Sequence, residues 1–209
     1  FAASVARELV ARDVTVVAGL ALGIDAAAHR AALEADGRTV AIIGTGINRV
    51  YPAANRELHE EIAVRGLLLS QFWPDAPAQK HTFLMRNATM SGYGLATVVV
   101  EAGEHSGARA QARMAVEHGR PVILNDTVVR KNLWAQELEG RPGIYVASGP
   151  EDVLEIVDRL IKGESMVIAD LRRLVSSQTC WMLSSRSDYA RLSSPSLVDT
   201  CVTRFGRTM

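Results

Sequence analysis

Residues 39–46 read Thr39-Val-Ala-Ile-Ile-Gly-Thr-Gly46, an uncharged, mostly apolar run that ends in a glycine turn. Such a run is typical of a strand buried on both faces of a sheet. Similar runs occur at Val14-Thr-Val-Val-Ala18 and Leu95-Ala-Thr-Val-Val-Val100. Because parallel sheets are covered by helices on both faces, their strands are continuous apolar runs, so these runs favour a parallel sheet between two layers of helices.

The segments between these runs alternate between helical and strand patterns. Helices are expected at Phe1–Arg12, Asp25–Ala35, Ala53–Arg65, Met85–Ser91, Gly107–His118, Leu133–Leu138 and Glu151–Ile161. Further strands are expected at Leu67–Ser70, Pro121–Leu124 and Ile144–Val146. With right-handed crossovers, this alternation predicts an α/β fold, a doubly wound parallel sheet sandwich of the Rossmann-like kind.

Composition narrows the classes of protein that this chain can represent. The 209 residues carry 23 Lys and Arg against 23 Asp and Glu, so the formal net charge is zero. Two cysteines, Cys180 and Cys201, are too few for a disulfide scaffold. The sequence has neither an apolar run that would span a membrane nor a signal-peptide pattern. We therefore expect a cytoplasmic protein with no membrane partner.

The composition changes near residue 164. Residues 165–209 hold six Arg, three Asp and nine Ser, and their sequence shows no helical or strand period beyond 166–175. We therefore predict one patterned domain over residues 1–163 and a poorly ordered Ser/Arg-rich tail over 164–209.

Ligands of such sheets bind beyond the carboxyl ends of the strands. There, Gly44-Thr45-Gly46 is either a phosphate-binding loop or an ordinary turn. Ser106-Gly107 begins a helix, which either holds an anion or is simply capped. Arg86-Asn87 offers a guanidinium and an amide at this edge, and Arg109 lies one turn into the later helix.

No catalytic machinery is evident in the sequence. Asp25 and His29 lie four residues apart on one helix face, where a surface or capping pair is commoner than an acid–base pair. No HExxH, CxxC or GxSxG pattern occurs. We expect no catalytic residue, no metal site and no cofactor.

Five segments, in order and at matching spacing, resemble the DprA/Smf family of DNA-processing proteins over about residues 1–125, with a looser match to 162. They are Val17-Ala-Gly-Leu-Ala-Leu-Gly-Ile-Asp-Ala-Ala-Ala-His29, Gly37–Gly46 with Val50-Tyr-Pro52, Phe83 with Arg86-Asn87 and Ser91-Gly92, Val98-Val-Val-Glu-Ala102 with Ser106-Gly107, and Ala115 with Gly119-Arg-Pro-Val122.

The resemblance implies a Rossmann-like domain that binds single-stranded DNA in a basic pocket at the sheet edge. It implies a non-enzymatic role: protecting incoming DNA in natural transformation and assisting a RecA-type recombinase, commonly as a homodimer. The DNA- or phosphate-binding residues that it implies are Gly44, Thr45, Gly46, Arg86, Asn87, Ser106 and Gly107, with Arg109 replacing a lost basic position.

The sequence departs from the family pattern at several places, including Ala108-Arg109-Ala110-Gln111, where the family has a Ser/Thr-rich stretch. Leu22 stands where the family has a basic residue, and Ala88 stands where it has a second arginine. The family's first strand, with its Gly-Ser-Arg loop, is absent before Phe1. Fewer basic groups imply fewer phosphate contacts and a weaker dependence of binding on salt.

Two alternatives remain beside DNA binding. One is a nucleotide-binding sensor or nucleotide-processing enzyme of the wider group that includes the Lonely-guy phosphoribohydrolases, although their PGGxGTxxE-type loop is absent. The other is a truncated domain without a ligand, whose unburied apolar helix faces would cause dimerisation or aggregation.

Overall fold

The computed structural model describes residues 1–163 and residue 166. The described residues up to Ile161 belong to one compact unit. Within the described part, no helix combines the length and the apolar character that a bilayer crossing requires. The predicted tail at 164–209 lies outside the described residues apart from Met166, so that boundary stays a prediction.

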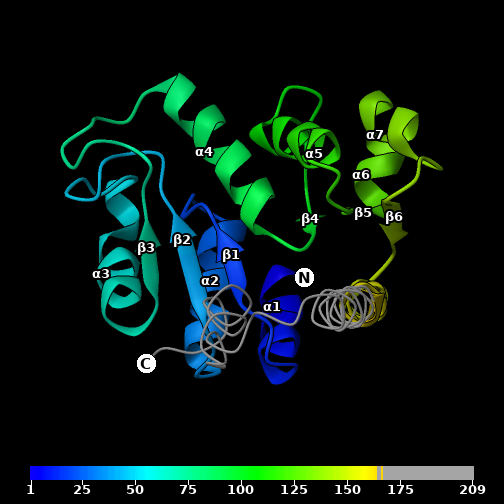
Figure 1. The fold of residues 1–209 in the computed structure, drawn as a ribbon, viewed down its shortest axis with the longest axis horizontal. Coiled ribbons are helices and arrows are strands. Elements are labelled where there is room, and N and C mark those ends of the chain that lie inside the picture. Colours follow the sequence, from blue (N-terminus) through cyan, green and yellow to red (C-terminus); the bar gives the residue numbers. More distant parts are fainter. Residues whose placement is uncertain (164–165, 167–209) are drawn as a thin grey trace, which may run out of the picture. The chain divides into compact units, whose positions relative to one another are not determined.

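The strands form two parallel three-stranded sheets (Figure 1). The first has the order β1-β2-β3, with Val17 opposite Val40 and Ala41 opposite Leu68. The second has the order β4-β5-β6, with Val98 opposite Ile123. The strands are β1 (Val16–Ala18), β2 (Thr39–Ile42), β3 (Leu67–Leu69), β4 (Thr97–Val99), β5 (Val122–Asn125) and β6 (Ile144–Ala147).

Helices alternate with these strands, as predicted. They are α1 (Ala2–Ala11), α2 (Ile24–Glu34), α3 (Arg56–Arg65) after a short 3-10 turn η1 (Ala53–Asn55), α4 (Lys80–Tyr93), α5 (Gly107–Glu117), α6 (Asp126–Lys131), α7 (Leu133–Leu138) and a last helix from residue 150 to at least 163. The parallel α/β fold is therefore confirmed.

Two helices differ from the prediction. The helix α4 is longer than expected because Gln79 and Thr82 form a reciprocal capping box that begins it before the apolar pattern does. The short helix α6 was not predicted. It begins where the Asn125 side chain accepts a hydrogen bond from the Thr127 amide, at 2.9 Å.

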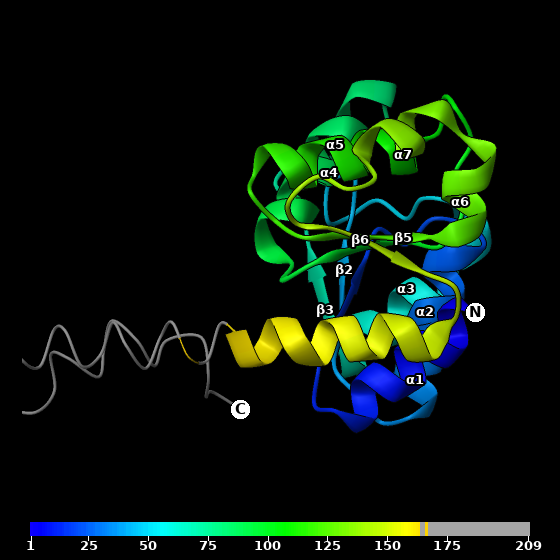
Figure 2. The ribbon, with the colours of Figure 1, turned by 90° about the vertical axis from the view of Figure 1, so that its right-hand side faces the viewer.

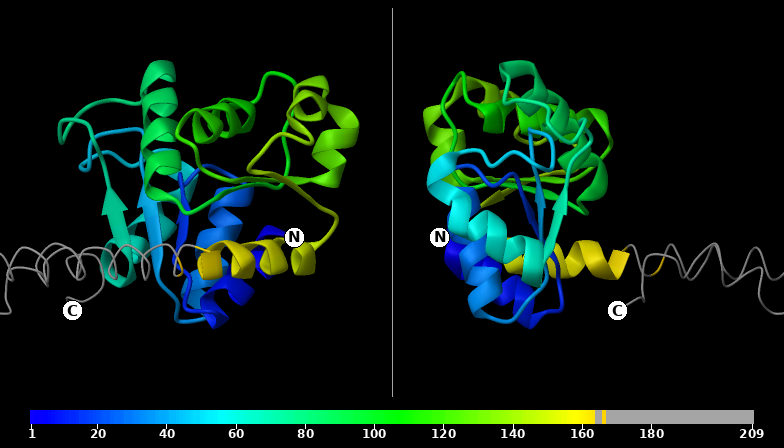
Figure 3. Two further views of the ribbon diagram at one scale, coloured as in Figure 1. Left: turned by 45° about the vertical axis from the view of Figure 1, so that its right-hand side comes forward. Right: turned by 90° about the vertical axis from the view of Figure 1, so that its left-hand side faces the viewer.

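The strands do not join into one sheet. Both β1 and β4 are edge strands, and neither pairs with the other. In Figures 2 and 3 the strands of the first sheet run upright while those of the second run across the view. The two sheets nonetheless belong to the parallel α/β fold that was predicted. No described strand lies between these two edges to connect their hydrogen-bond ladders.

The second sheet is covered on both faces. Val122 and Leu124 pack with α5, α6 and α7, whereas Ile123, between them, packs with α1 and the last helix. This alternation follows from the period of two in strand side chains. It explains why β5 carries no polar residue before Asn125.

The helix α1 packs against both sheets. Its Val5 lies in the cluster of Ile123 and the last helix, and the adjacent Ala6 lies in the cluster of Val16 and α2. Across the molecule, α4 contacts both β2 and α5 (Figure 1). These two helices therefore connect the halves that the strands leave unconnected.

Replacing Ile123 by alanine should lower the free energy of unfolding by about 2–5 kcal/mol, the usual cost of truncating a fully buried isoleucine. Ile123 is 0% exposed and lies between two helical layers. Urea unfolding followed by circular dichroism measures the change. Val64→Ala, at a side chain that is 85% exposed, is the matched control. Equal losses from the two substitutions would contradict this account of the core.

Candidate functional site

The turn after β1 is fixed by two polar side chains. The Asp25 carboxylate accepts hydrogen bonds from the amides of Gly19, at 3.0 Å, and Ala21, at 3.2 Å. Between them Leu20 is fully buried and has a φ of 60°, an unusual conformation for a residue with a branched side chain. The Asn55 amide donates to the carbonyls of Leu20 and Ala21. The turn is thus held from both sides at the carboxyl end of β1.

The candidate phosphate loop Gly44-Thr45-Gly46 is buried by the segment that follows β3. The Gly46 amide donates to the Ala76 carbonyl at 2.9 Å, and the Thr45 hydroxyl donates to the Arg49 carbonyl at 3.0 Å. A Cβ atom on Gly46 would collide with the carbonyls of Trp73 and Pro74. This close approach of backbone to backbone explains why glycine is needed at this position.

The candidate Arg86 is buried at the carboxyl ends of β1 and β2. Its guanidinium donates to the carbonyl of Gly19, at 2.5 Å, and to that of Ile42, at 2.9 Å. Burial lowers the pKa of Arg86, and the charge of Asp25 opposes this shift. No carboxylate of the described residues forms an ion pair with it. In this structure Arg86 therefore connects two strand ends.

The remaining candidates lie where α4 meets the start of α5. The Asn87 amide donates to the Gly107 carbonyl at 3.3 Å. The Ser106 hydroxyl accepts from the Arg109 amide at 3.3 Å and caps α5. The Arg109 guanidinium donates to the Glu104 main-chain carbonyl at 2.7 Å. The Glu104 carboxylate lies 3.8 Å from the same guanidinium. Gly107 and Arg109 are exposed, so this part of the site is open to solvent.

Two exposed aromatic side chains, on the loops after β2 and β3, were not expected from the sequence. The loops after these strands are hydrogen-bonded to each other: Asn48 donates to the Pro74 carbonyl at 2.9 Å and Arg49 to the Asp75 carbonyl at 3.2 Å. On these loops Trp73 is 86% exposed and Tyr51 is 50% exposed. The sequence signal for this exposure was the position of Trp73 in a proline-containing loop, outside any predicted helix or strand.

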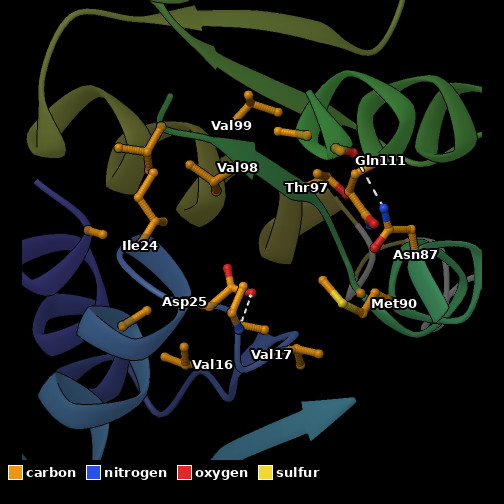
Figure 4. A pocket seen from close by; sticks show the side chains of 18 of the residues that line it. Val16, Val17, Ile24, Asp25, Asn87, Met90, Thr97, Val98, Val99 and Gln111 are labelled. Atoms are coloured by element: carbon orange, nitrogen blue, oxygen red, sulfur yellow. Dashed lines mark hydrogen bonds between the residues drawn. The ribbon is translucent and has the colours of Figure 1, made fainter. Parts of the chain in front are cut away.

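A cavity of about 890 Å³ lies between β1 and β4 (Figure 4). Apolar side chains such as Val17, Ile24, Val98 and Met90 line much of it. The polar side chains in Figure 4 are those of Asp25, Asn87, Thr97 and Gln111, which face the cavity from four different elements. Among the residues that the structure describes, no group of three or more His, Cys, Asp and Glu is placed to hold a metal ion.

Asp25 and His29 have separate roles. His29 is fully buried, and its Nδ1 lies 2.7 Å from the Thr39 hydroxyl, which donates to the Val16 carbonyl at 3.0 Å. Because that hydroxyl proton is engaged, Nδ1–H is the donor to Thr39. Burial lowers the pKa of His29 to about 4, an effect that the charge of Asp25 partly opposes. His29 thus joins α2, β2 and β1 in its neutral form.

Comparison with known proteins gives consistent results. The family model for DNA recombination-mediator protein A matches residues 1–155. A putative DNA processing protein DprA of Mycobacterium tuberculosis is 46% identical over 160 residues, covering 76% of this chain and 41% of that protein. Protein Smf of Synechocystis is 34% identical over 167 residues, covering 80% and 39%. The chain thus spans about two fifths of the length of these curated relatives.

Solved structures of the same kind share the fold. DNA processing protein A of Streptococcus pneumoniae matches with a TM-score of 0.61 and 32% identity, over 74% of this chain and 56% of that one. A structure describing the single-stranded DNA binding mode of DNA processing protein A of Helicobacter pylori matches with a TM-score of 0.67 and 25% identity, over 76% and 72%. A molybdenum cofactor binding protein of Rippkaea orientalis, 18% identical, shares the fold alone (TM-score 0.55; 77% and 85% covered).

The neutral state of His29 makes stability depend on pH. Its pKa is lower in the folded protein than the ordinary value of 6.5, so the unfolded chain binds the proton more readily. The contribution is complete above about pH 6.5, is lost as the pH falls towards 4, and amounts to about 3 kcal/mol. Urea unfolding at pH 7 and pH 4.5 should show a larger loss for the natural chain than for His29→Gln. An identical loss would disprove the assignment.

Removing the Arg86 guanidinium should destabilise the fold. Arg86→Met keeps the apolar stem but leaves the Gly19 and Ile42 carbonyls without their donor, a loss of about 2–4 kcal/mol. The free energy of unfolding in urea measures it. The control is Arg113→Met, at an exposed arginine on α5 paired with Glu117. If Arg86→Met is as stable as the control, the carbonyl contacts do not support the fold.

Proposed function

Because the chain belongs to the DNA recombination-mediator protein A family, we propose that it binds single-stranded DNA at the carboxyl edge of its sheets. The Helicobacter pylori relative, described by its single-stranded DNA binding mode, supports this proposal. So do the curated relatives, which are named as DNA processing proteins.

The observation that carries the proposal is the exposure of Trp73 and Tyr51 on two loops that are hydrogen-bonded to each other. Large aromatic side chains are normally at least partly buried. The Trp73 ring is 86% exposed, so its packing adds little to the stability of the fold. Unpaired bases stack on such rings at about 1–3 kcal/mol each and without a strict sequence requirement. Arg49, on the same loop as Tyr51, is exposed and could contact the phosphates that link the bases.

We assign the candidate residues to two roles. Ser106, Gly107 and Arg109 are proposed to contact phosphates, since the start of α5 and the exposed Arg109 guanidinium, which also contacts Glu104, suit an anion. Gly44, Thr45, Gly46, Arg86 and Asn87 are proposed to shape the edge from beneath, because hydrogen bonds or tight packing inside the protein already engage them.

The lost basic positions also fit this arrangement. Leu22 is strongly exposed in the turn after β1, so an apolar side chain occupies a place at the edge where a cation would meet DNA. Ala88 follows Asn87 on α4 and carries no charge. We expect phosphate contacts to be few and aromatic stacking to supply a correspondingly larger share of the affinity.

The wider role is a proposal from the family. It comprises protection of incoming DNA during natural transformation, assistance to a RecA-type recombinase, and action as a homodimer in the cytoplasm. We propose a binding role rather than an enzymatic one, which fits the structural rather than catalytic use of Asp25 and His29. Since the chain spans about two fifths of its curated relatives, these roles belong to the whole protein.

Trp73→Ala should weaken binding of a fluorescently labelled oligothymidylate by roughly 5- to 150-fold, the loss of one stacked base. Fluorescence anisotropy at several salt concentrations measures both the dissociation constant and its salt dependence.

Arg49→Ala should reduce the slope of log affinity against log salt by about one phosphate contact.

Matched controls locate the effect. Tyr93→Ala removes an exposed aromatic at the far end of α4, and Arg7→Ala removes an exposed arginine of α1 that pairs with Glu34. Neither should change DNA affinity. No binding by the natural chain at low salt would refute the proposal. Saturable thermal stabilisation by a mononucleotide instead would support the alternative of a nucleotide sensor or enzyme.

A further inference from the structure

The loop that joins β4 to α5 is anchored to the segment between α6 and α7. The side-chain amide of Asn132, a residue that is 3% exposed, donates to the carbonyls of Ala102, at 3.0 Å, and Val128, at 2.9 Å. On either side of the loop, Ala102 and Ala108 pack against the apolar cluster that contains Trp134. Because a buried amide and apolar packing both hold this loop, its main chain has a defined position after β4.

Glu104, on this loop, has contacts at both of its carboxylate oxygens. Its Oε1 accepts a hydrogen bond, at 2.6 Å, from the Leu133 amide in the first turn of α7. Its Oε2 lies 3.8 Å from the Arg109 guanidinium, which also donates to the Glu104 main-chain carbonyl at 2.7 Å. The carboxylate therefore cannot turn away from Arg109 without giving up its hydrogen bond to the Leu133 amide.

This contact places a negative charge beside the cation that we propose to meet a DNA phosphate. The side chain of Arg109 is 45% exposed and that of Glu104 is 41% exposed, so a strand can reach both. An anion held 3.8 Å from a cation reduces the charge that this cation presents to a second anion. A phosphate that binds Arg109 must also approach the carboxylate, and the two negative charges repel each other less as salt is added.

We propose that Glu104 competes with DNA phosphate for Arg109 and thereby limits the affinity of this edge for single-stranded DNA. The inference rests on the proposed function. A purely structural role for Glu104, holding α7 through the Leu133 amide, needs only an acceptor oxygen, which a neutral glutamine also supplies. Competition with phosphate needs the negative charge. A substitution that removes the charge and keeps the oxygen therefore separates the two roles.

Glu104→Gln is that substitution, and it should tighten binding of a labelled oligothymidylate about two- to fivefold, the usual range for one exposed ion pair. Fluorescence anisotropy at several salt concentrations should also give a slope of log affinity against log salt that is steeper by up to about one phosphate contact. The matched control is Glu117→Gln at the end of α5, where Glu117 lies 3.7 Å from the exposed Arg113. The control removes the same charge from a similar pair and should change neither quantity.

A second comparison shows whether the effect depends on Arg109. Arg109→Ala should weaken binding, because it removes the proposed phosphate contact. In that background Glu104→Gln should gain less affinity than it does in the natural chain, since no guanidinium remains for the carboxylate to hold. The free energy of unfolding in urea checks that Glu104→Gln leaves the fold intact.

Three results would overturn the inference while DNA binding itself stands. Equal affinity of Glu104→Gln and the natural chain would show that the carboxylate does not compete. Weaker binding by Glu104→Gln would mean that the charge of Glu104 positions Arg109 for the phosphate. An equal gain with and without Arg109 would show a general effect of charge. Absence of binding by both the natural chain and Glu104→Gln at low salt would instead refute the proposed function, and the inference with it.

Discussion

The buried guanidinium of Arg86 sets the geometry on which the carboxyl edge depends. It lies on α4 and donates to one carbonyl at the end of β1 and to one at the end of β2, so a single side chain fixes the separation of two strands and a helix. Phe83, one turn earlier, lies against Gly44, where a larger residue would collide with its ring. The contacts of Arg86 and Phe83 therefore fix the turn after β1, the loop after β2 and the start of α4 relative to one another.

Within these motifs, some residues support the edge from inside the protein and others are exposed at it. A charged residue in a glycine-rich neighbourhood suggests phosphate binding, yet in the folded chain backbone carbonyls already occupy the guanidinium of Arg86. Exposed groups, by contrast, come from loops with little sequence pattern, such as those that carry Arg49 and Trp73. The surface that we propose for DNA thus combines the motif residues Ser106 and Gly107 with exposed loop residues, whereas Arg86 supports it from beneath.

The strands and most helices could be predicted because apolar runs and helical spacing are local properties of the sequence. The length of α4 could not, since a capping box between Gln79 and Thr82 outweighs a polar composition. Which strand edges pair, and that β1 and β4 do not, depends on which edges meet in space rather than on local sequence patterns. At the site, Ser106 could be recognised as a cap, whereas the burial of Arg86 and the exposure of Trp73 depend on contacts between segments distant in sequence.

The turn after β1 has a consequence for how this protein can vary. Leu20 holds a left-handed backbone conformation only because Asp25 binds the flanking amides and Asn55 binds the carbonyls. These residues act on one strained conformation, so the energetic effects of replacing Asp25 and Asn55 will not add. Once either anchor is lost, the turn is free to relax and the other anchor has less to hold. The effect of replacing Asp25 on stability therefore depends on whether Asn55 has already been replaced, and the reverse also holds.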